Sequence, residues 1–122
     1  MTDDTAYDLF REGQKRLRKG MTAQATVPLE KAKRLEPEKA SIREALGIAY
    51  FRLARWTDAE REFRTIVEDL SPTDHYAHYA LGRALERQGK RSEANGHYKL
   101  ASSMKPGSET YASRILQLED DE

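Results

Sequence analysis

The chain has 122 residues, of which 38% are hydrophobic and 34% are charged, with 21 basic residues, 21 acidic residues and no cysteine. A chain of this size can bury a core of its own, and its balanced charge removes any global attraction to nucleic acid or to an anionic membrane. The lack of cysteine excludes disulfides, thiolate metal sites and cysteine nucleophiles.

The amino-terminal segment, residues 1–8, carries three acidic residues and no apolar run. It therefore resembles neither a secretion signal nor a transit peptide. No apolar stretch in the sequence reaches the roughly 18 residues that can span a bilayer. We therefore expect a cytoplasmic protein.

A period of about 34 residues runs through the sequence. Each unit has a glycine, an alanine twelve residues later, a bulky apolar residue four residues after that, and a closing proline. These residues are Gly13, Ala25, Leu29 and Pro37 in the first unit, Gly47, Ala59, Phe63 and Pro72 in the second, and Gly82, Ala94, Tyr98 and Pro106 in the third. The second unit carries one extra residue between Ala59 and Pro72.

Each unit predicts two helices joined by a short turn, over residues 6–39, 40–73 and 74–107. Residues that can cap a helix amino terminus stand near several of the expected starts. These are Thr22, Thr57 with Glu60, Ser71 with Asp74 and Pro72, and Ser92. Gly20 and Gly89 follow basic residues and are expected to end the first helices of units one and three. Pro28 lies inside an expected helix and predicts a kink there.

A closing helix is expected over residues 108–118. Tyr111, Ile115 and Leu118 recur at the spacing of one helical face, and Ser108 can open the helix. We expect this apolar stripe to cover the last helix pair. The acidic residues 119–122 are expected to form a solvated tail.

The second unit resembles the tetratricopeptide repeat family, whose pattern is W-x2-L-G-x2-Y, then A-x3-F, then P. The matching residues are Leu46, Gly47, Tyr50, Ala59 and Phe63 in the second unit, and Leu81, Gly82, Gly89, Ala94, Tyr98 and Pro106 in the third. The first unit has Leu9 at the tryptophan position, and Glu12 and Arg16 replace the leucine and the tyrosine. The resemblance covers residues 6–106. It implies an all-α fold, a right-handed α-solenoid of three helix-turn-helix hairpins plus a capping helix.

The resemblance also implies that the concave strip along the first helices binds the ligand. Helical periodicity separates this strip from the packed face of each helix. Its residues are Tyr7, Phe10, Arg11, Gln14 and Arg18 in unit one, Glu44, Ile48, Phe51 and Arg52 in unit two, and Tyr76, Tyr79, Arg83 and Arg87 in unit three. Aromatic residues and arginines are enriched at binding hot spots, and arginine pairs well with carboxylates. We expect a peptide that is acidic and has apolar anchors.

The alternative for Tyr7, Phe10 and Tyr76 is that they only fill gaps between neighbouring units. The family's clamp for a carboxy-terminal carboxylate uses lysines and asparagines at defined places in the groove. This chain has other residues there, namely Phe10, Gln14, Ala45, Tyr76 and Ala80. We therefore expect a different binding mode.

Two further signals have ordinary explanations. His75 and His78 have a spacing that can ligate a metal, but no third ligand is obvious, so we expect a solvated helix start and neither a metal nor a cofactor. The basic run Lys15, Arg16, Arg18 and Lys19 is expected to be a solvated face rather than a nucleic-acid site.

No motif in the sequence predicts catalysis: it contains no glycine-rich phosphate loop and no nucleophile with an identifiable base. We predict a protein–protein interaction module or scaffold. The alternative is self-association through the groove or the last helix, with the segment 118–122 as the ligand of another copy's groove.

Overall fold

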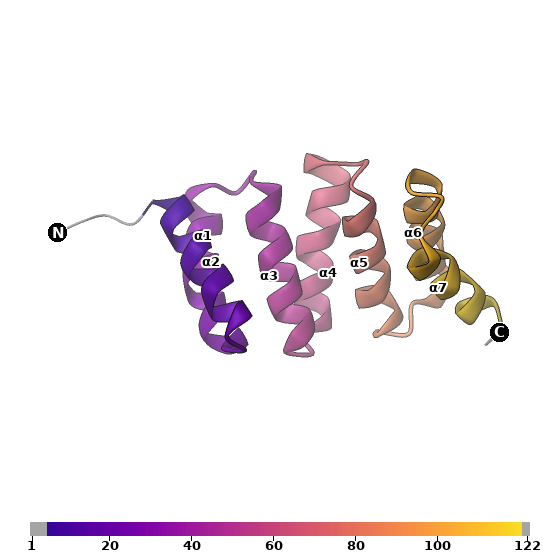
Figure 1. Ribbon diagram of the computed structural model, residues 1–122, viewed down its shortest axis with the longest axis horizontal. Helices are drawn as coiled ribbons and strands as arrows, with labels where there is room; N and C mark the ends of the chain where they lie inside the picture. Colours follow the sequence, from indigo (N-terminus) through magenta and orange to yellow (C-terminus); the bar gives the residue numbers. More distant parts are fainter. Residues whose placement is uncertain (1–4, 121–122) are drawn as a thin grey trace.

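The structure is a computed structural model that describes residues 5–120, apart from the side chains of Leu116, Glu119 and Asp120. The helices follow one another in chain order along the long axis of the molecule, with α1 and α2 at one end and α6 and α7 at the other (Figure 1). They are α1 (Ala6–Arg18), α2 (Thr22–Leu35), α3 (Ala40–Arg52), α4 (Trp56–Thr65), a π-helical segment (Ile66–Leu70), α5 (His75–Glu86), α6 (Arg91–Met104) and α7 (Glu109–Asp120). Each helix packs against the next one in the chain. The predicted all-α solenoid is confirmed.

The repeated glycines receive a bulky side chain from the second helix of each pair. A Cβ placed on Gly47 would lie 2.6 Å from the ring of Phe63, and one on Gly82 would lie 2.5 Å from the ring of Tyr98. A Cβ on Gly13 would lie 2.4 Å from the side chain of Leu29. The period in the sequence therefore records a close side-chain contact between the two helices of a pair.

The turns inside the helix pairs are capped by the backbone and not by the predicted hydroxyl groups. α2 begins at Thr22, α4 at Trp56 and α6 at Arg91, so Thr22, Thr57 and Ser92 lie inside their helices. The residue before each of these helices donates its amide to a carbonyl five residues earlier, as Arg55 does to Tyr50 at 2.9 Å. This bond closes the preceding helix in a Schellman-type turn that continues directly into the next helix. No side-chain cap is present at these three helix starts, so the three capping predictions are wrong.

The residue at the centre of each turn has a left-handed backbone. Gly20 and Gly89 have φ of +77° and +81°, which confirms that they end the first helices. Ala54 takes the equivalent place in the second pair with φ of +59°. A residue with a Cβ is strained there by about 1 kcal/mol or more.

The extra residue of the second unit is absorbed inside a helix. α4 continues into the π-helical segment, and the amide of Ser71 bonds the carbonyl of Ile66 at 2.6 Å, five residues back. A π-turn accommodates one additional residue while the helix keeps packing on both sides of it. Ile66 and Val67 accordingly remain buried.

The third pair begins later than predicted. α5 starts at His75, and the carboxylate of Asp74 accepts the amide of Ala77 at 3.0 Å. Ser71 and Pro72 stay in the turn, because the π-helical segment extends the preceding helix to Leu70. The prediction that Ser71 caps a helix with Pro72 in its first turn is therefore wrong.

α2 continues through Pro28 from Thr22 to Leu35, and the kink at Pro28 stays a prediction. Proline has no amide hydrogen, so the carbonyl of Gln24, four residues earlier, loses its usual donor. The guanidinium of Arg16 donates to this carbonyl at 2.9 Å. Arg16 is therefore half-buried and bound, and the prediction that it belongs to a solvated basic face is wrong.

α7 closes the stack as predicted. Tyr111 and Leu118 are buried, Ile115 is half-buried against the core, and Ser108 accepts the amide of Tyr111 at 3.3 Å. The expected tail, residues 119–122, lies outside the residues whose side chains the structure describes. Across the described part of the chain, every helix is too short or too polar to cross a membrane.

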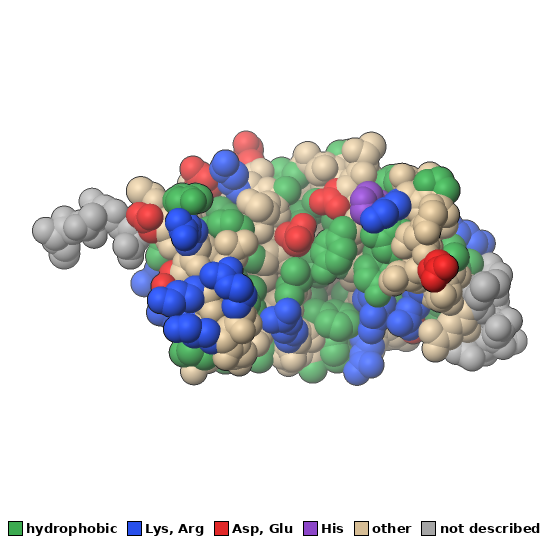
Figure 2. All heavy atoms as spheres, in the orientation of Figure 1, with side chains coloured by type: hydrophobic (Ala, Val, Ile, Leu, Met, Phe, Trp, Pro, Cys, Tyr) green, Lys and Arg blue, Asp and Glu red, His purple; other side chains and the backbone are tan. Residues whose placement is uncertain are grey.

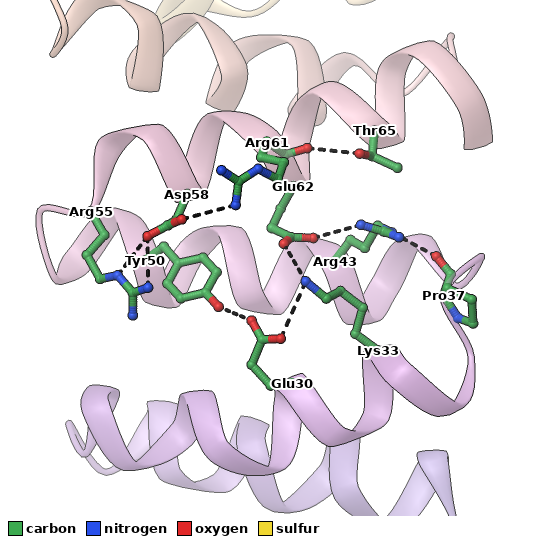
Figure 3. Close-up of polar contacts among 10 residues, drawn as sticks. All are labelled: Glu30, Lys33, Pro37, Arg43, Tyr50, Arg55, Asp58, Arg61, Glu62 and Thr65. Atoms are coloured by element: carbon green, nitrogen blue, oxygen red, sulfur yellow. Dashed lines mark hydrogen bonds and ion pairs between the residues drawn. The ribbon is translucent and has the colours of Figure 1, made fainter.

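A buried carboxylate connects the first two helix pairs. Glu62 on α4 is 1% exposed, and its oxygens lie 3.0 Å from Arg43 on α3 and 2.9 Å from Lys33 on α2 (Figure 3). Arg43 also donates to the carbonyl of Pro37 at 2.7 Å. Buried charges need such partners because an unpaired buried charge is costly.

Candidate functional site

The structure gathers part of the predicted strip around one pocket between α3 and α5. The pocket has a volume of about 290 Å³. It is lined by Ile48, Phe51 and Arg52 from α3, Phe63 from α4, and Tyr76, Tyr79, Ala80 and Arg83 from α5. Figure 2 shows apolar side chains in a hollow at the middle of this face, with acidic groups on one side and basic groups on the other.

The pocket has rigid aromatic walls. The rings of Phe63 and Tyr76 meet edge to face with centroids 6.5 Å apart, and those of Tyr76 and Tyr79 lie 6.3 Å apart. Tyr79 also contacts Tyr111 of α7, at 5.1 Å. Rings held in this way by the core and by the closing helix present a preformed apolar surface.

Arg83 and Arg52 stand at the pocket without a carboxylate partner among the described residues. The guanidinium of Arg83 lies 5.4 Å from the ring centroid of Phe51 and donates to the hydroxyl of Tyr79 at 3.1 Å. Arg52 is exposed and donates to the carbonyl of Leu17 at 3.4 Å. Both cations are therefore positioned by neutral groups, and their charge is not neutralised.

The other arginines of the strip are similar. Arg11 lies over the ring of Tyr7 and Arg87 over the ring of Trp56, at 5.7 and 4.6 Å from the ring centroids. Both arginines are exposed, as is Arg18, and none of the three forms an ion pair within the part of the chain that the structure describes.

The arginines of α4 differ from those of the strip. Arg64 pairs with Glu60, Glu68 and Glu93, and Arg61 pairs with Asp58. The charges of Arg61 and Arg64 on α4 are thus neutralised by carboxylates of this chain, whereas Arg34 on α2 is exposed and forms no ion pair among the described residues. The arginines of the strip are left available to a partner.

Two carboxylates lie beside the pocket without lining it: Glu44 is near Tyr76, and Asp74 is near Glu44. Glu44 is half-buried, and burial together with the negative charge of Asp74 raises the pKa of its carboxyl group. Burial and the charge of Glu44 likewise raise the pKa of Tyr76. Glu44 stands two turns before Arg52 on α3, so the pocket is polarised along the helix axis.

The rest of the strip lies outside the pocket. Tyr7 is 64% exposed on α1, so it fills no gap within this chain. Phe10 is half-buried and packs against the core, which agrees with the alternative that it fills a gap between neighbouring units. Gln14 is half-buried on the same helix. Arg87 belongs to the contact with Trp56 at the end of α5 and not to the pocket.

Two pocket residues were not recognised from the sequence as part of the strip. The sequence indicates Phe63 only as the bulky apolar residue of the repeat pattern and Ala80 only as a departure from the carboxylate clamp. The ring of Phe63 packs against Gly47 and also lines the pocket. The helical period of α5 could have indicated Ala80, which stands between Tyr79 and Arg83 on the sequence.

The prediction of a solvated histidine pair is wrong. His78 is 6% exposed, and its Nδ1 lies 3.1 Å from Nδ1 of His97 on α6. His75 instead meets the hydroxyl of Tyr111 at 2.8 Å. No group of three potential metal ligands occurs among the described residues. The available signal was that His78 holds the tryptophan position of the repeat pattern.

No protein-family model matches the chain. Among curated proteins, Superkiller complex protein 3 of Mus musculus is 32% identical over 96 residues, which are 79% of this chain and 6% of that protein. The chain therefore spans only a small part of the length of this relative.

Solved structures resemble the chain over nearly its whole length. The first TPR of Spaghetti (RPAP3), bound to the HSP90 peptide SRMEEVD, superposes with a TM-score of 0.91 at 21% identity, covering 96% of this chain and 92% of that one. The second TPR domain of human RPAP3, in complex with the HSP70 peptide SGPTIEEVD, gives 0.87 at 17% identity, covering 93% and 94%. At these identities the likeness concerns the fold.

Proposed function

Since the chain is a tetratricopeptide-repeat domain by its fold, with three repeats and a capping helix, we propose that it is a non-catalytic module that binds an acidic segment of a partner protein in its concave groove. We take the repeats as residues 6–39, 40–73 and 74–107. In this proposal the module acts as a scaffold in the cytoplasm and has no cofactor, and its ligand is neither a nucleic acid nor a membrane.

The observation that carries this proposal is the set of five strip arginines without carboxylate partners among the described residues. They are Arg11, Arg18, Arg52, Arg83 and Arg87. A carboxylate that binds an arginine already stacked on an aromatic ring forms charge-assisted bonds at little cost in ordering. An acidic segment is therefore the complementary ligand.

The peptides in the two similar structures end in the same acidic sequence, Glu-Glu-Val-Asp. They support an acidic ligand but not the same contacts. Phe10, Gln14, Ala45, Tyr76 and Ala80 stand where the family's clamp for a terminal carboxylate has lysines and asparagines. We therefore propose that side-chain carboxylates, and not a chain terminus, meet the arginines.

The tail of the chain is a weak candidate for the ligand. In the self-association alternative, the segment that would enter another copy's groove starts at Leu118. This side chain is 2% exposed within its own domain. Releasing Leu118 would uncover the core that α7 closes. We therefore propose a different protein as the partner, and light scattering over a concentration series tests this against dimer formation.

A selection of random peptides on the immobilised domain tests the function. We expect the selected peptides to be rich in Asp and Glu. Arg52→Glu combined with Arg83→Glu should weaken their binding at least about tenfold, because each replaces an attraction by a repulsion. Fluorescence of Trp56, the one tryptophan in the chain, reports binding.

The matched control carries Arg34→Glu and Arg61→Glu, which change the net charge equally at exposed positions on α2 and α4. Its affinity should stay close to that of the wild type. Equal losses in both variants would mean that net charge and not the groove determines binding. Selected peptides without acidic enrichment would contradict the proposal directly.

A further inference from the structure

We infer that the α3–α5 pocket binds one apolar side chain of the partner segment, of leucine to phenylalanine size, with a carboxylate on its Arg52–Arg83 side and a cation on its Glu44–Asp74 side. This inference rests on the proposed function and specifies the chemistry of the segment. The occupant is a net acidic stretch of a different protein that has one basic residue beside its apolar anchor.

The apolar anchor follows from the pocket's size and walls. Its volume of about 290 Å³ lies at the lower limit of small-molecule sites, which hold roughly 300–1,000 Å³. Ile48, Phe51, Phe63, Tyr76 and Tyr79 line it. A single side chain fits these dimensions better than a cofactor does, and its burial against aromatic walls is favourable.

The carboxylate follows from Arg83. This side chain is half-buried and is held between the ring of Phe51 and the hydroxyl of Tyr79. A carboxylate arriving there meets a guanidinium that is already oriented and partly shielded from water. Such a bond is stronger than one to a freely moving surface arginine. Arg52 adds a second cation on the same side.

The cation follows from the two carboxylates at the opposite side. Glu44 and Asp74 are near enough to repel each other, and Glu44 has no cationic partner among the described residues. Asp74 uses one oxygen to cap α5 through Ala77. A lysine or arginine of the partner would relieve this repulsion, whereas a third carboxylate would increase it.

The geometry of α3 sets the spacing of these charges. Glu44 and Arg52 are eight residues apart, which corresponds to roughly 12 Å along a helix. An extended peptide advances about 3.3 Å per residue. A segment that crosses the pocket parallel to α3 therefore carries its cation and its carboxylate about four residues apart, with the anchor between them.

Synthetic peptides test this directly. The probes are Gly-Lys-Gly-X-Gly-Glu-Gly and its reverse, acetylated and amidated, with leucine, phenylalanine or alanine at X, together with versions in which glutamate replaces lysine. Chemical-shift titration of the isotope-labelled domain gives the affinities. In one of the two chain directions, leucine should bind about tenfold more tightly than alanine. The lysine peptide should also bind better than its all-acidic version.

Two variants separate the anchor from the charges. Ala80→Met places a flexible side chain into the pocket and should abolish the preference for leucine over alanine. Glu44→Lys leaves the pocket open and should reverse the preference, so that the all-acidic peptide binds best. Glu68→Lys, the same charge change at an exposed position of the π-helical segment, should leave both preferences unchanged.

The outcomes distinguish this inference from the proposed function. If acidic peptides bind and depend on Arg52 and Arg83, but leucine equals alanine or Glu44→Lys changes nothing, the function stands and this inference is wrong. If no acidic peptide binds the groove, both are wrong. If light scattering shows a dimer that the probes dissociate, the pocket's occupant is a second copy and the inference is overturned.

Discussion

The second and third helix pairs place different chemistry at the same point of the repeat. Four residues before its glycine, the second pair has Arg43 and the third has His78. The partner on the following helix is Glu62 in one pair and His97 in the other. Both Arg43 and His78 also bind the carbonyl of the proline that closes the preceding unit, Pro37 at 2.7 Å and Pro72 at 2.8 Å.

The difference teaches that this position supplies a donor to the proline carbonyl in both pairs, although the charge of the donor differs. Because the carbonyl of Pro72 can only accept, Nε2 of His78 donates to it. Nδ1 of His78 then accepts from Nδ1 of His97. The second pair thus holds a permanent ion pair, whereas the third holds a neutral contact that a proton can change.

The largest expected effect is that of breaking the ion pair. Glu62→Ala leaves Arg43 and Lys33 without their shared buried acceptor, and the free energy of unfolding should fall by about 3–5 kcal/mol. Urea unfolding measures this loss. Glu68→Ala removes only a partner on the exposed surface of the neighbouring turn, and its effect should stay within about 0.5 kcal/mol.

Replacing both members of the pair sharpens the interpretation. Arg43→Met with Glu62→Met removes the buried charges together, while Lys33 keeps Glu30 at 3.4 Å. Most of the lost stability should return, because no uncompensated carboxylate or guanidinium remains in the core. A double variant as unstable as Glu62→Ala would show that packing, and not charge, causes the loss.

A smaller effect should be equal in the two pairs. Gly47→Ala and Gly82→Ala each drive a Cβ into an aromatic ring, and each should cost about 1–3 kcal/mol. Gly96→Ala is the control, since a Cβ there meets nothing within 4 Å and the helix should gain about 0.5–1 kcal/mol. Thermal unfolding compares the three. Unequal costs at the first two glycines would mean that the pairs differ in more than their polar contacts.

The smallest effect is a pH dependence that His97 of the third pair introduces. Burial, then the neighbouring His78 and the charge of Arg64, lower the pKa of His97 below its usual 6.5, although Glu93 and Glu68 act in the opposite direction. The unfolded chain therefore takes up a proton near pH 6.5 more readily than the folded one. Stability is full above this pH and declines as the pH falls from 7 towards 5.

Transplanting the ion pair should remove this dependence. His78→Arg with His97→Glu gives the third pair the chemistry of the second, and the decline of the urea midpoint that His97 causes between pH 7 and 5 should disappear. Glu60, whose carboxylate is stabilised by Gln88, Lys90 and Arg64 against the effect of burial, has a lowered pKa and loses its contribution only below about pH 4.5. If the stability of this double variant depended on pH as that of the wild type does, groups other than His78 and His97 would cause the effect.

The sequence by itself determined the repeat and the fold. The contact of each glycine with a bulky residue recurs at a fixed separation, and the stripe of Tyr111, Ile115 and Leu118 follows the helical period. Such contacts join residues close in the chain, so their spacing appears directly in the sequence. The same spacing showed that the second unit has an extra residue, though not that a π-turn absorbs it.

Only the tertiary structure decided how the polar groups are used. The carbonyl left free by Pro28 is bound by Arg16, and His78 is buried against His97, because a neighbouring helix supplies each partner. The pocket is likewise formed by three helices, so the first helices alone do not indicate that Phe63 of α4 belongs to it. Helix starts were misplaced because the backbone turns from one helix directly into the next, and this geometry leaves the hydroxyl groups without a capping role.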